Sequence, residues 1–284
     1  MAKSQKTLDK IEQTREMLRV AGVVLKDYRP QTVRQVYYQL VSRQVIDNNR
    51  SQYQRVSTLL VKARQDGSIP WHWIEDRMRK PRQPAMWHNP ADFAKACMQY
   101  RRNVWQSQEN YFELWLEKDA LSGIFEDTLQ HYGVTLNVGR GYDGWSSIRN
   151  AAMRYKRYED EGRQVSIRYY GDFDPSGEDM VRSLEERLRT FGITPEITKS
   201  ALNNDDIQTY NLPPDMTKAT DSRQAGFVEK WGDVAVELDA LPIQVLQQRI
   251  IGDVEGLMDM GSFEALIKRE TNERDAIVEA VSAI

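Results

Sequence analysis

The sequence has few cysteines and histidines, and it has no long run of apolar residues. Its one cysteine, Cys97, cannot form an intramolecular disulfide, and its three histidines are scattered without the spacing of a metal site. The longest wholly apolar run, Val20 to Leu25, has six residues, far fewer than a membrane span needs. No apolar segment follows the lysines near the start, so no secretory signal is expected. These absences predict a cytoplasmic protein with no membrane partner.

Charged residues of the two signs are divided unevenly along the 284 residues, although the net charge is only -3. Residues 1–110 contain 20 Lys and Arg against 10 Asp and Glu, whereas the rest of the chain contains 19 against 32. A basic first part and an acidic second part are expected when one domain contacts a polyanion and the other binds cations. Charge also segregates between domains by chance. The length is sufficient for two domains, each with its own core.

The first part of the chain has the pattern of a helical DNA-binding domain. Apolar residues recur at helical spacing over 8–25, 33–40 and 53–63, and residues 69–74 are typical of a short extended segment. Three helices followed by a β element are the order of a winged helix, a fold in which one helix enters the major groove. We therefore expect a winged-helix DNA-binding domain over residues 1–88.

Basic residues in this domain are candidates for contacts with DNA phosphates. A basic cluster between residues 76 and 88 is flanked by tryptophans, which suits a nucleic-acid backbone but is equally ordinary in a solvated linker between domains. Asn89 is then expected to cap a connecting helix within residues 89–110, whose apolar stripe would bury Cys97. The candidate DNA-binding residues are Arg55, Lys62, Arg64, Arg77, Arg79, Lys80 and Arg82.

From residue 111 onward the pattern changes to strands that alternate with helices. β-type runs near 111–117, 134–138 and 165–170 are separated by helical patterns. This alternation predicts an α/β fold with a parallel sheet and right-handed crossovers. We expect this second domain, with a helical C-terminal extension, to occupy residues 111–284.

Acidic residues follow two of these predicted strands. Glu117 ends the first strand, and Asp172 and Asp174 end the third, within the stretch from Gly171 to Gly177. The carboxyl ends of parallel strands lie along one edge of the sheet, where α/β proteins bind their ligands. Carboxylates placed close together repel each other unless a cation lies between them, and Mg²⁺ is the usual candidate. The alternative is an Asp-rich turn that only caps the following helix.

Two adjacent tyrosines lie in the second predicted helix. Tyr37 is four residues from Val33 and three from Leu40, so it shares their apolar face and is expected to pack in the core. Tyr38 then turns toward Arg34 and solvent. Without other information, adjacent tyrosines in an apolar helix ordinarily have only a packing role.

The acidic motifs resemble those of the TOPRIM domain in the topoisomerase VI A subunit and in the related meiotic double-strand-break transesterase. The Glu-Lys element of that family is matched by Glu117 and Lys118, and its Asp-x-Asp-Pro-x-Gly element by residues 172–177. Its Gly-Lys-Gly-Tyr-Pro-Asp loop is echoed by residues 139–143, with Arg140 in place of the Lys and without the Pro. The nearest likeness is to the stand-alone Mini-A proteins of mobile elements.

The resemblance also covers the N-terminal domain, because in that family a winged helix of the catabolite-activator type precedes the Rossmann-like TOPRIM domain. Its catalytic tyrosine is the second of an aromatic pair after an Arg, as in the stretch from Arg34 to Tyr38. The resemblance implies that Tyr38 attacks double-stranded DNA and stays attached to its 5′ end, with help from Arg34. It also implies that Glu117, Asp172 and Asp174 bind Mg²⁺. The residues that it implies around this metal are Lys118, Arg140 and Tyr142.

In the same family the tyrosine of one protomer meets the metal of the other, which implies a homodimer. Strand passage would need a separate ATPase subunit of the topoisomerase VI B type, because this chain has no Walker-type Gly-rich loop. Two other functions stay open. One is a TOPRIM nuclease in which water replaces Tyr38 and the DNA ends are free, and the other is a winged-helix DNA-binding protein without catalysis. No role is predicted for residues 195–284.

Overall fold

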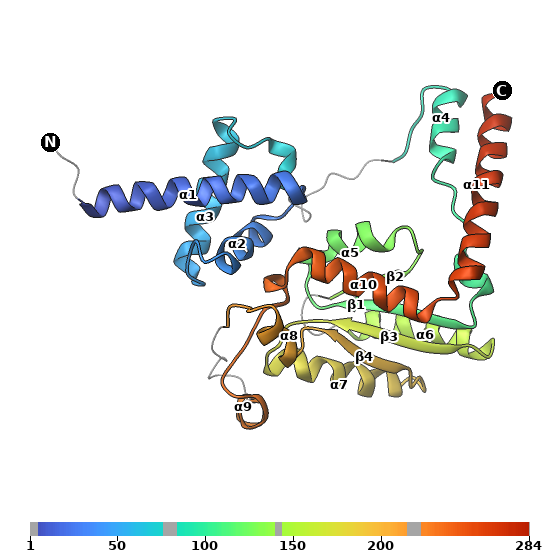
Figure 1. Ribbon diagram of the computed structural model, residues 1–284. Helices are drawn as coiled ribbons and strands as arrows, with labels where there is room; N and C mark the ends of the chain where they lie inside the picture. The colour runs from blue at the N-terminus through green and yellow to red at the C-terminus, as the bar shows by residue number, and fades with distance from the viewer. Residues whose placement is uncertain (1–4, 76–83, 140–143, 215–222, 284) are drawn as a thin grey trace.

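A four-stranded parallel sheet lies at the centre of the second part of the chain, and helices cover both of its faces (Figure 1). The computed structural model describes residues 5–75, 84–139, 144–214 and 223–283. Within these ranges, no helix combines the length and the apolar character that crossing a lipid bilayer requires. The α/β class with a parallel sheet, predicted from the alternating pattern, is confirmed.

The strands are ordered β2-β1-β3-β4, and every neighbouring pair is parallel. Leu116 of β1 is in register with Val138 of β2 and with Tyr170 of β3, so these three strands end at one edge. The chain leads outward from β1 to β2 and then returns past β1 to β3. Such a reversal is the switch point at which open α/β sheets bind ligands. The strands are β1 (Asn110–Leu116), β2 (Thr135–Val138), β3 (Gln164–Tyr170) and β4 (Glu196–Ala201).

The helices of this part pack on the two faces of the sheet, with α5 and α10 on one face and α6 and α7 on the other (Figure 1). In α7, Met180, Leu184 and Leu188 are buried at a spacing of four residues and form the stripe that packs on the sheet. The helices and short turns are α5 (Ser122–Leu129), α6 (Trp145–Asp160), α7 (Pro175–Arg189), α8 (Asn204–Thr209), α9 (Gln224–Trp231), α10 (Ile243–Leu257), η4 (Asp119–Leu121) and η5 (Leu238–Ala240).

Three helices form the N-terminal module, as predicted, but the expected β element does not follow them. Residues 69–74 contain the 3-10 turn η1 (Trp71–Trp73), and their strand pairing is limited to one parallel bridge between Gln31 and Ile74. The physical reason is local, because the N–H of Trp73 bonds to the carbonyl of Pro70 at 3.1 Å. The helices are α1 (Gln5–Tyr28), α2 (Val33–Ser42) and α3 (Arg50–Gln65).

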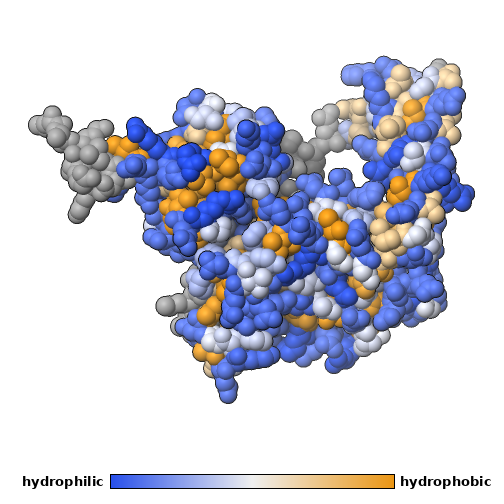
Figure 2. All heavy atoms as spheres, in the orientation of Figure 1, coloured by the Kyte–Doolittle hydropathy of each residue, from blue (hydrophilic) through white to orange (hydrophobic). Residues whose placement is uncertain are grey.

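The N-terminal module keeps an apolar surface. Figure 2 shows apolar side chains gathered on its visible face. Val23 of α1 and Val61 of α3 are large apolar side chains that stay exposed. The rest of the described chain therefore does not cover this module completely.

The connecting helix is shorter than expected. The helix α4 (Pro90–Cys97) begins at the predicted Asn89 cap but ends at Cys97, which is only half-buried, so the prediction of a buried cysteine is wrong. Beyond it the chain makes polar contacts with α11 (Met260–Ser282), which lies beside α4 (Figure 1). Tyr100 donates a hydrogen bond of 2.8 Å to Glu273. The turn η3 (Val104–Ser107) leads from there to β1.

The buried carboxylate of Glu113 in β1 is surrounded by hydrogen-bond donors. Arg154 donates two hydrogen bonds to it, at 2.9 and 2.8 Å. The hydroxyls of Tyr111 and Tyr155 donate at 2.7 and 2.8 Å, and the amide of Asn137 donates at 2.6 Å. Because the Glu113 side chain is fully buried, these bonds compensate for the loss of water around its charge. The network ties β1 to β2 and α6.

Replacing Arg154 with leucine is expected to lower the free energy of unfolding by about 3 kcal/mol, because the buried Glu113 charge would lose its cationic partner. Denaturant titration followed by circular dichroism would measure this loss. Lys156→Ala on the same helix is the control, since its pair with Asp160 is exposed and is expected to contribute less than about 0.5 kcal/mol. Equal losses in the two variants would contradict the role given to the network.

Candidate functional site

Two acidic side chains meet at the switch point between β1 and β3. Glu117 directly follows β1, and Asp172 lies shortly after β3. Both residues are buried, and Glu117 Oε2 accepts a hydrogen bond of 2.8 Å from the backbone N–H of Asp172. The structure thus brings Glu117 and Asp172 together, as expected for residues at the carboxyl ends of neighbouring parallel strands.

Gly171 and Gly177 allow this close approach. A Cβ atom on Gly171 would lie 2.5 Å from Glu117 Oε2, and one on Gly177 would overlap the backbone carbonyl of Asp172. Real Cβ atoms essentially never come so close to other atoms, so a side chain at Gly171 would displace the Glu117 carboxylate, and one at Gly177 would displace the backbone of the acidic loop. The two glycines of the motif are therefore required by packing.

Asp174 has a different surrounding from that of Asp172. It is the N-cap of α7, and its Oδ1 accepts a hydrogen bond of 2.6 Å from the backbone N–H of Gly177. Asp174 therefore caps the following helix, which is the alternative that the sequence left open for this acidic turn. Among the residues that the structure describes, no three acidic, histidine or cysteine side chains are arranged to hold a metal ion. Glu117 and Asp172 form a pair, and Asp174, two residues further along the same loop, is engaged as the cap of α7.

Cationic side chains neutralise part of this acidic edge. Lys118, which was expected near the site, forms an ion pair with Asp172 Oδ2, and its Nζ lies 3.5 Å from Glu237 Oε2. Lys199 Nζ donates to the carbonyl of Asp172 at 2.8 Å and to Glu178 at 2.6 Å. Lysine side chains thus contact both the carboxylate and the backbone carbonyl of Asp172.

Burial raises the pKa of Glu117 to about 7, and the negative charge of Asp172 acts in the same direction. The hydrogen bond from the Asp172 N–H and the charge of Lys118 oppose this rise. Near neutral pH the Glu117 carboxyl is therefore divided between its protonated and ionised forms. A cation at this edge would favour the ionised form.

The raised pKa of Glu117 predicts a pH dependence of stability without metal. The folded protein keeps a proton that the unfolded chain releases near pH 4.5, so the free energy of unfolding falls as the pH rises from about 4.5 to about 7, by at most about 3 kcal/mol. Glu117→Gln stays neutral and is expected to remove this fall. Denaturant titrations in EDTA at several pH values would measure it, with Glu185→Gln on the surface of α7 as the control. Identical pH profiles for Glu117→Gln and the parent would count against the raised pKa.

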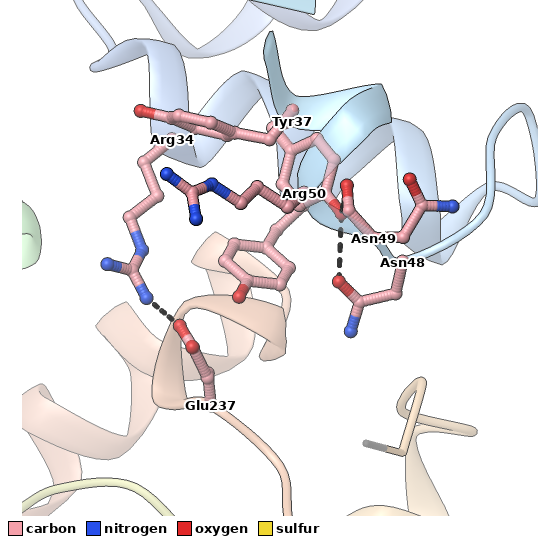
Figure 3. A pocket seen from close by; sticks show the side chains of 8 residues that line it. Arg34, Tyr37, Asn48, Asn49, Arg50 and Glu237 are labelled. Atoms are coloured by element: carbon pink, nitrogen blue, oxygen red, sulfur yellow. Dashed lines mark hydrogen bonds and ion pairs between the residues drawn. The ribbon is translucent and has the colours of Figure 1, made fainter. Parts of the chain in front are cut away.

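The helix that carries the tyrosine pair begins in a capping box. Thr32 Oγ1 accepts a hydrogen bond from the Gln35 N–H at 3.3 Å, and Gln35 Oε1 accepts one from the Thr32 N–H at 2.7 Å. Further along α2, the rings of Tyr37 and Tyr38 pack edge to face with their centres 5.0 Å apart. The Tyr37 hydroxyl donates to Asn48 Oδ1 at 2.8 Å (Figure 3). Tyr37 is therefore a packed residue, as expected.

Tyr38 lies against Arg34 but is not turned toward solvent. The guanidinium carbon of Arg34 is 5.7 Å from the centre of the Tyr38 ring. Only 6% of Tyr38 is exposed, so the expected solvent exposure is wrong, because η5 of the second part packs against α2. Burial raises the pKa of the Tyr38 phenol above its usual range, Arg34 opposes this rise, and Asp239 and Asp172 add to it.

Arg34 connects α2 to the acidic edge. Its Nε lies 2.7 Å from Asp239 Oδ2, and its terminal nitrogen forms an ion pair with Glu237 (Figure 3). Between these two acidic residues, Leu238 donates its backbone N–H to Asp172 Oδ1 at 2.9 Å. No sequence pattern pointed to Glu237 or Asp239, because Glu237 lies 203 residues from its partner. The one local feature that sets them apart is that they are two acidic residues on either side of the buried Leu238.

A cavity of about 320 Å³ lies where α2, the start of α3 and the residue before η5 come together (Figure 3). Tyrosine rings can stack on bases, and arginine and asparagine side chains can donate hydrogen bonds to phosphate oxygens. Most of the lining groups therefore suit a nucleotide. The exception is the carboxylate of Glu237, which would repel a phosphate. The lining residues are Arg34, Tyr37, Tyr38, Asn48, Asn49, Arg50, Tyr53 and Glu237.

The predicted DNA-binding residues have different surroundings. Arg55 donates to Gln13 Oε1 at 2.5 Å and to Thr14 Oγ1 at 2.7 Å, so it ties α3 to α1. Arg64 lies over a tryptophan ring of η1 at 4.9 Å, whereas Lys62 is exposed. Lys62 is therefore the one of these three that is open to solvent. Outside the described residues lie Arg77, Arg79, Lys80, Arg82, Arg140 and Tyr142.

The donors at the acidic edge fit Mg²⁺. Carboxylate oxygens are its preferred protein ligands, and Mg²⁺ commonly binds through one or two carboxylates while it keeps several waters. Glu117 and Asp172 supply two carboxylates at neighbouring strand ends, the Glu117 carboxylate accepts a hydrogen bond from the Asp172 backbone, and Gly171 has no side chain to block Glu117. The residues that would hold Mg²⁺ are thus Glu117 and Asp172, with Asp174 close by in the same loop.

Comparison with known proteins identifies no relative, since no protein family, no curated protein and no solved structure matches this chain. A functional conclusion therefore depends on the residues themselves and on their geometry.

Proposed function

We propose that this protein is a Mg²⁺-dependent DNA-cleaving transesterase, similar to the topoisomerase VI A subunit, in which Tyr38 is the nucleophile. One observation carries the proposal: Arg34 links the tyrosine to the segment that lies beside the acidic edge. Its guanidinium lies by the Tyr38 ring and is paired with Asp239, close to the Asp172 edge. A phenol, a guanidinium and paired carboxylates are the groups that phosphoryl transfer to a tyrosine requires.

The proposal includes the two domains that the motifs resemble. A switch point between β1 and β3 with acidic residues at it supports a TOPRIM-like second domain. Three helices in the basic part of the chain support a winged-helix-like first domain, although residues 69–74 do not form its β element. The proposed partners are double-stranded DNA, a second copy of the chain and, for strand passage, a separate ATPase subunit of the topoisomerase VI B type.

In the proposed reaction, the Tyr38 oxygen attacks a DNA phosphorus atom in line with the 3′ oxygen. The bond from phosphorus to Tyr38 forms while the bond to the 3′ oxygen breaks, so the number of phosphodiester bonds is unchanged. The phenol loses a proton and the 3′ oxygen gains one. Arg34 stabilises the negative charge of the phenolate. When bound by Glu117 and Asp172, Mg²⁺ would neutralise charge on the phosphate.

Hydrolysis of DNA by water is a second candidate function, and the burial of Tyr38 favours it. Burial raises the pKa of the Tyr38 phenol, so the hydroxyl stays protonated near neutral pH and is then a weak nucleophile. A hydrolytic reaction would use the same carboxylate edge, but it would leave free DNA ends.

Cleavage of supercoiled plasmid separates the two reactions. The protein is incubated with plasmid and Mg²⁺, the mixture is quenched with detergent, and half of it is digested with protease. Transesterification leaves protein on the 5′ ends, so cut DNA enters the gel only after digestion. Hydrolysis gives the same cut DNA with or without protease. Removal of Mg²⁺ with EDTA is expected to abolish either reaction. If the protein binds DNA but does not cut it, both reactions are excluded, and the protein is a DNA-binding protein without catalysis.

A further inference from the structure

The cavity that Tyr38 lines has the size of a small ligand site (Figure 3). Its volume of about 320 Å³ lies at the lower end of the range of ligand pockets, roughly 300–1,000 Å³. Its walls come from α2, from the start of α3 and from Glu237, so segments far apart in the sequence build it together. A ligand held there lies beside the proposed nucleophile.

Tyr53 offers this cavity an aromatic surface for a base. Its ring packs against that of Tyr37, with the ring centres 5.4 Å apart and the planes at 86° to each other. Tyr53 is nevertheless 37% exposed, whereas Tyr37 is buried and its hydroxyl is bonded to Asn48. Stacking on exposed aromatic rings is the usual way in which proteins hold the bases of single-stranded nucleic acid. Tyr53 is therefore the ring that a base can reach.

Arg50 supplies a positive charge for a phosphate at the same cavity (Figure 3). It is the first residue of α3 and is exposed, and in the part of the chain that the structure describes it forms no ion pair with an acidic side chain. Arg34, the other arginine of the cavity, is already paired with Glu237 and Asp239. A guanidinium that is free of carboxylates can bind a phosphate through two hydrogen bonds. Arg50 is therefore better suited than Arg34 to a DNA phosphate.

Glu237 lines the cavity with a carboxylate, which suits a base and not a phosphate. A carboxylate only accepts hydrogen bonds, so it attracts N–H groups. Its charge is partly balanced by Arg34 and by Lys118, whose Nζ lies 3.5 Å from Glu237 Oε2, and the side chain stays partly exposed. Among the DNA bases, only guanine has two neighbouring N–H donors on its pairing edge, at N1 and at the N2 amino group. Arg50 and Glu237 thus suit the two ends of one guanine nucleotide.

We propose that this cavity binds one unpaired nucleotide of the DNA, next to the phosphate that Tyr38 attacks, and that guanine is the preferred base. The base lies on Tyr53 and donates to Glu237, while its phosphate binds to Arg50. The inference rests on the proposed function and deepens it, because it names the substrate class as DNA that is unpaired at the cut. In a regular duplex the pairing edge of guanine is bonded to cytosine, so the base has to leave the stack before it enters the cavity.

Binding of duplexes with one unpaired nucleotide tests the inference without cleavage. Fluorescence anisotropy in EDTA gives the Kd of short duplexes that are fully paired or that carry one extra guanine, inosine or thymine at the centre. The duplex with the extra guanine is expected to bind at least about tenfold more tightly than those with an extra thymine or none. Inosine lacks the N2 amino group and is expected to give an intermediate Kd. Equal Kd values for the guanine and thymine duplexes, or for the guanine and paired duplexes, would overturn the inference.

Glu237→Gln tests the contact with the base. Glutamine has nearly the same shape but only one acceptor oxygen, so the preference for guanine over thymine is expected to fall to about twofold or less. The readout is a ratio of two Kd values for the same variant, so a general loss of stability does not change it. Glu229→Gln, an exposed carboxylate in α9, is the matched control and should keep the parent's preference. A full preference for guanine in Glu237→Gln would contradict the role of this residue.

Arg50→Gln tests the contact with the phosphate. The loss of affinity is expected to be the same for each extra base, and the slope of log Kd against log salt concentration is expected to fall by about 1. Arg189→Gln is the matched control, because Arg189 is paired with Glu185 on the exposed face of α7, and the slope should not change. A slope that stays at the parent's value in Arg50→Gln would count against the phosphate contact.

The adduct assay with Mg²⁺ separates this inference from the proposed function. Preferred binding of the guanine duplex without any adduct would support the nucleotide site and defeat only the proposed function. Equally fast adduct formation on the paired and guanine duplexes would defeat only the inference. Free dGMP has the same chemistry as the DNA nucleotide and is tested as a competitor. If dGMP binds while the guanine duplex binds no more tightly than the paired one, the cavity is a site for a free nucleotide, and the inference is overturned.

Discussion

Replacing Tyr38 with phenylalanine is expected to reduce the covalent protein–DNA adduct at least about a thousandfold. The variant keeps the ring that packs edge to face with Tyr37 and lies against Arg34, and it loses only the oxygen that would bond to phosphorus. Because the packing is retained, the loss would report on the chemistry and not on folding. Plasmid cleavage with a detergent quench, followed by protease digestion, measures the adduct.

Tyr37→Phe is the matched control for this prediction. It removes a hydroxyl that donates to Asn48, so it is expected to lower the free energy of unfolding by about 1 kcal/mol. Its adduct should stay within about threefold of the parent's, since the Tyr37 hydroxyl is already used in a structural hydrogen bond. If Tyr38→Phe cuts DNA as fast as the parent, the tyrosine is not the nucleophile, and hydrolysis becomes the favoured reaction.

Replacing Asp172 with asparagine is expected to reduce Mg²⁺-dependent cleavage by about a hundredfold to a thousandfold. Asparagine has nearly the same shape, and its oxygen can still accept the hydrogen bond from the Leu238 N–H. The change removes one negative charge from the pair that would bind Mg²⁺, and Lys118 loses its closest anionic partner. The rate of plasmid cleavage over a range of Mg²⁺ concentrations measures the effect.

Binding of DNA should survive this substitution, because Asp172 lies at the acidic edge and offers no donor to a phosphate. A gel-shift assay in EDTA would check this, and circular dichroism would check the fold. Glu185→Gln, whose pair with Arg189 lies on the exposed face of α7, is the control and should cut at the parent's rate. Full activity of Asp172→Asn at low Mg²⁺ would mean that the metal is not bound at this carboxylate.

Much of the second domain could be predicted because its signals are local. The strands β1 and β3 are buried along nearly their whole length, and aromatic and branched aliphatic side chains, which favour strands, make up much of their sequences. The strand β4 was missed because it is only partly buried and its residues are largely polar. The convergence of Glu117 and Asp172 followed from the alternation of strands and helices, which makes the sheet parallel and brings the strand ends to one edge.

The N-terminal half shows where local patterns fail. The apolar residues 69–74 are compatible with a strand or a turn, and the choice depended on whether a partner strand was near. The spacing around Cys97 favoured a longer helix, but polar contacts of the following residues with α11 ended it. At residues 69–74 a local turn replaced the expected strand, whereas beyond Cys97 the contact with a distant segment overrode the local preference.

The parallel sheet, the strand ends that carry Glu117 and Asp172, and the packed role of Tyr37 could all be predicted without coordinates. Each of these depends on spacing within one element or on the order of neighbouring elements. The burial of Tyr38 and the ion pairs of Arg34 with Glu237 and Asp239 became visible only in the folded chain. Burial and ion pairs depend on which elements pack together, and no periodicity relates two residues that lie 203 positions apart.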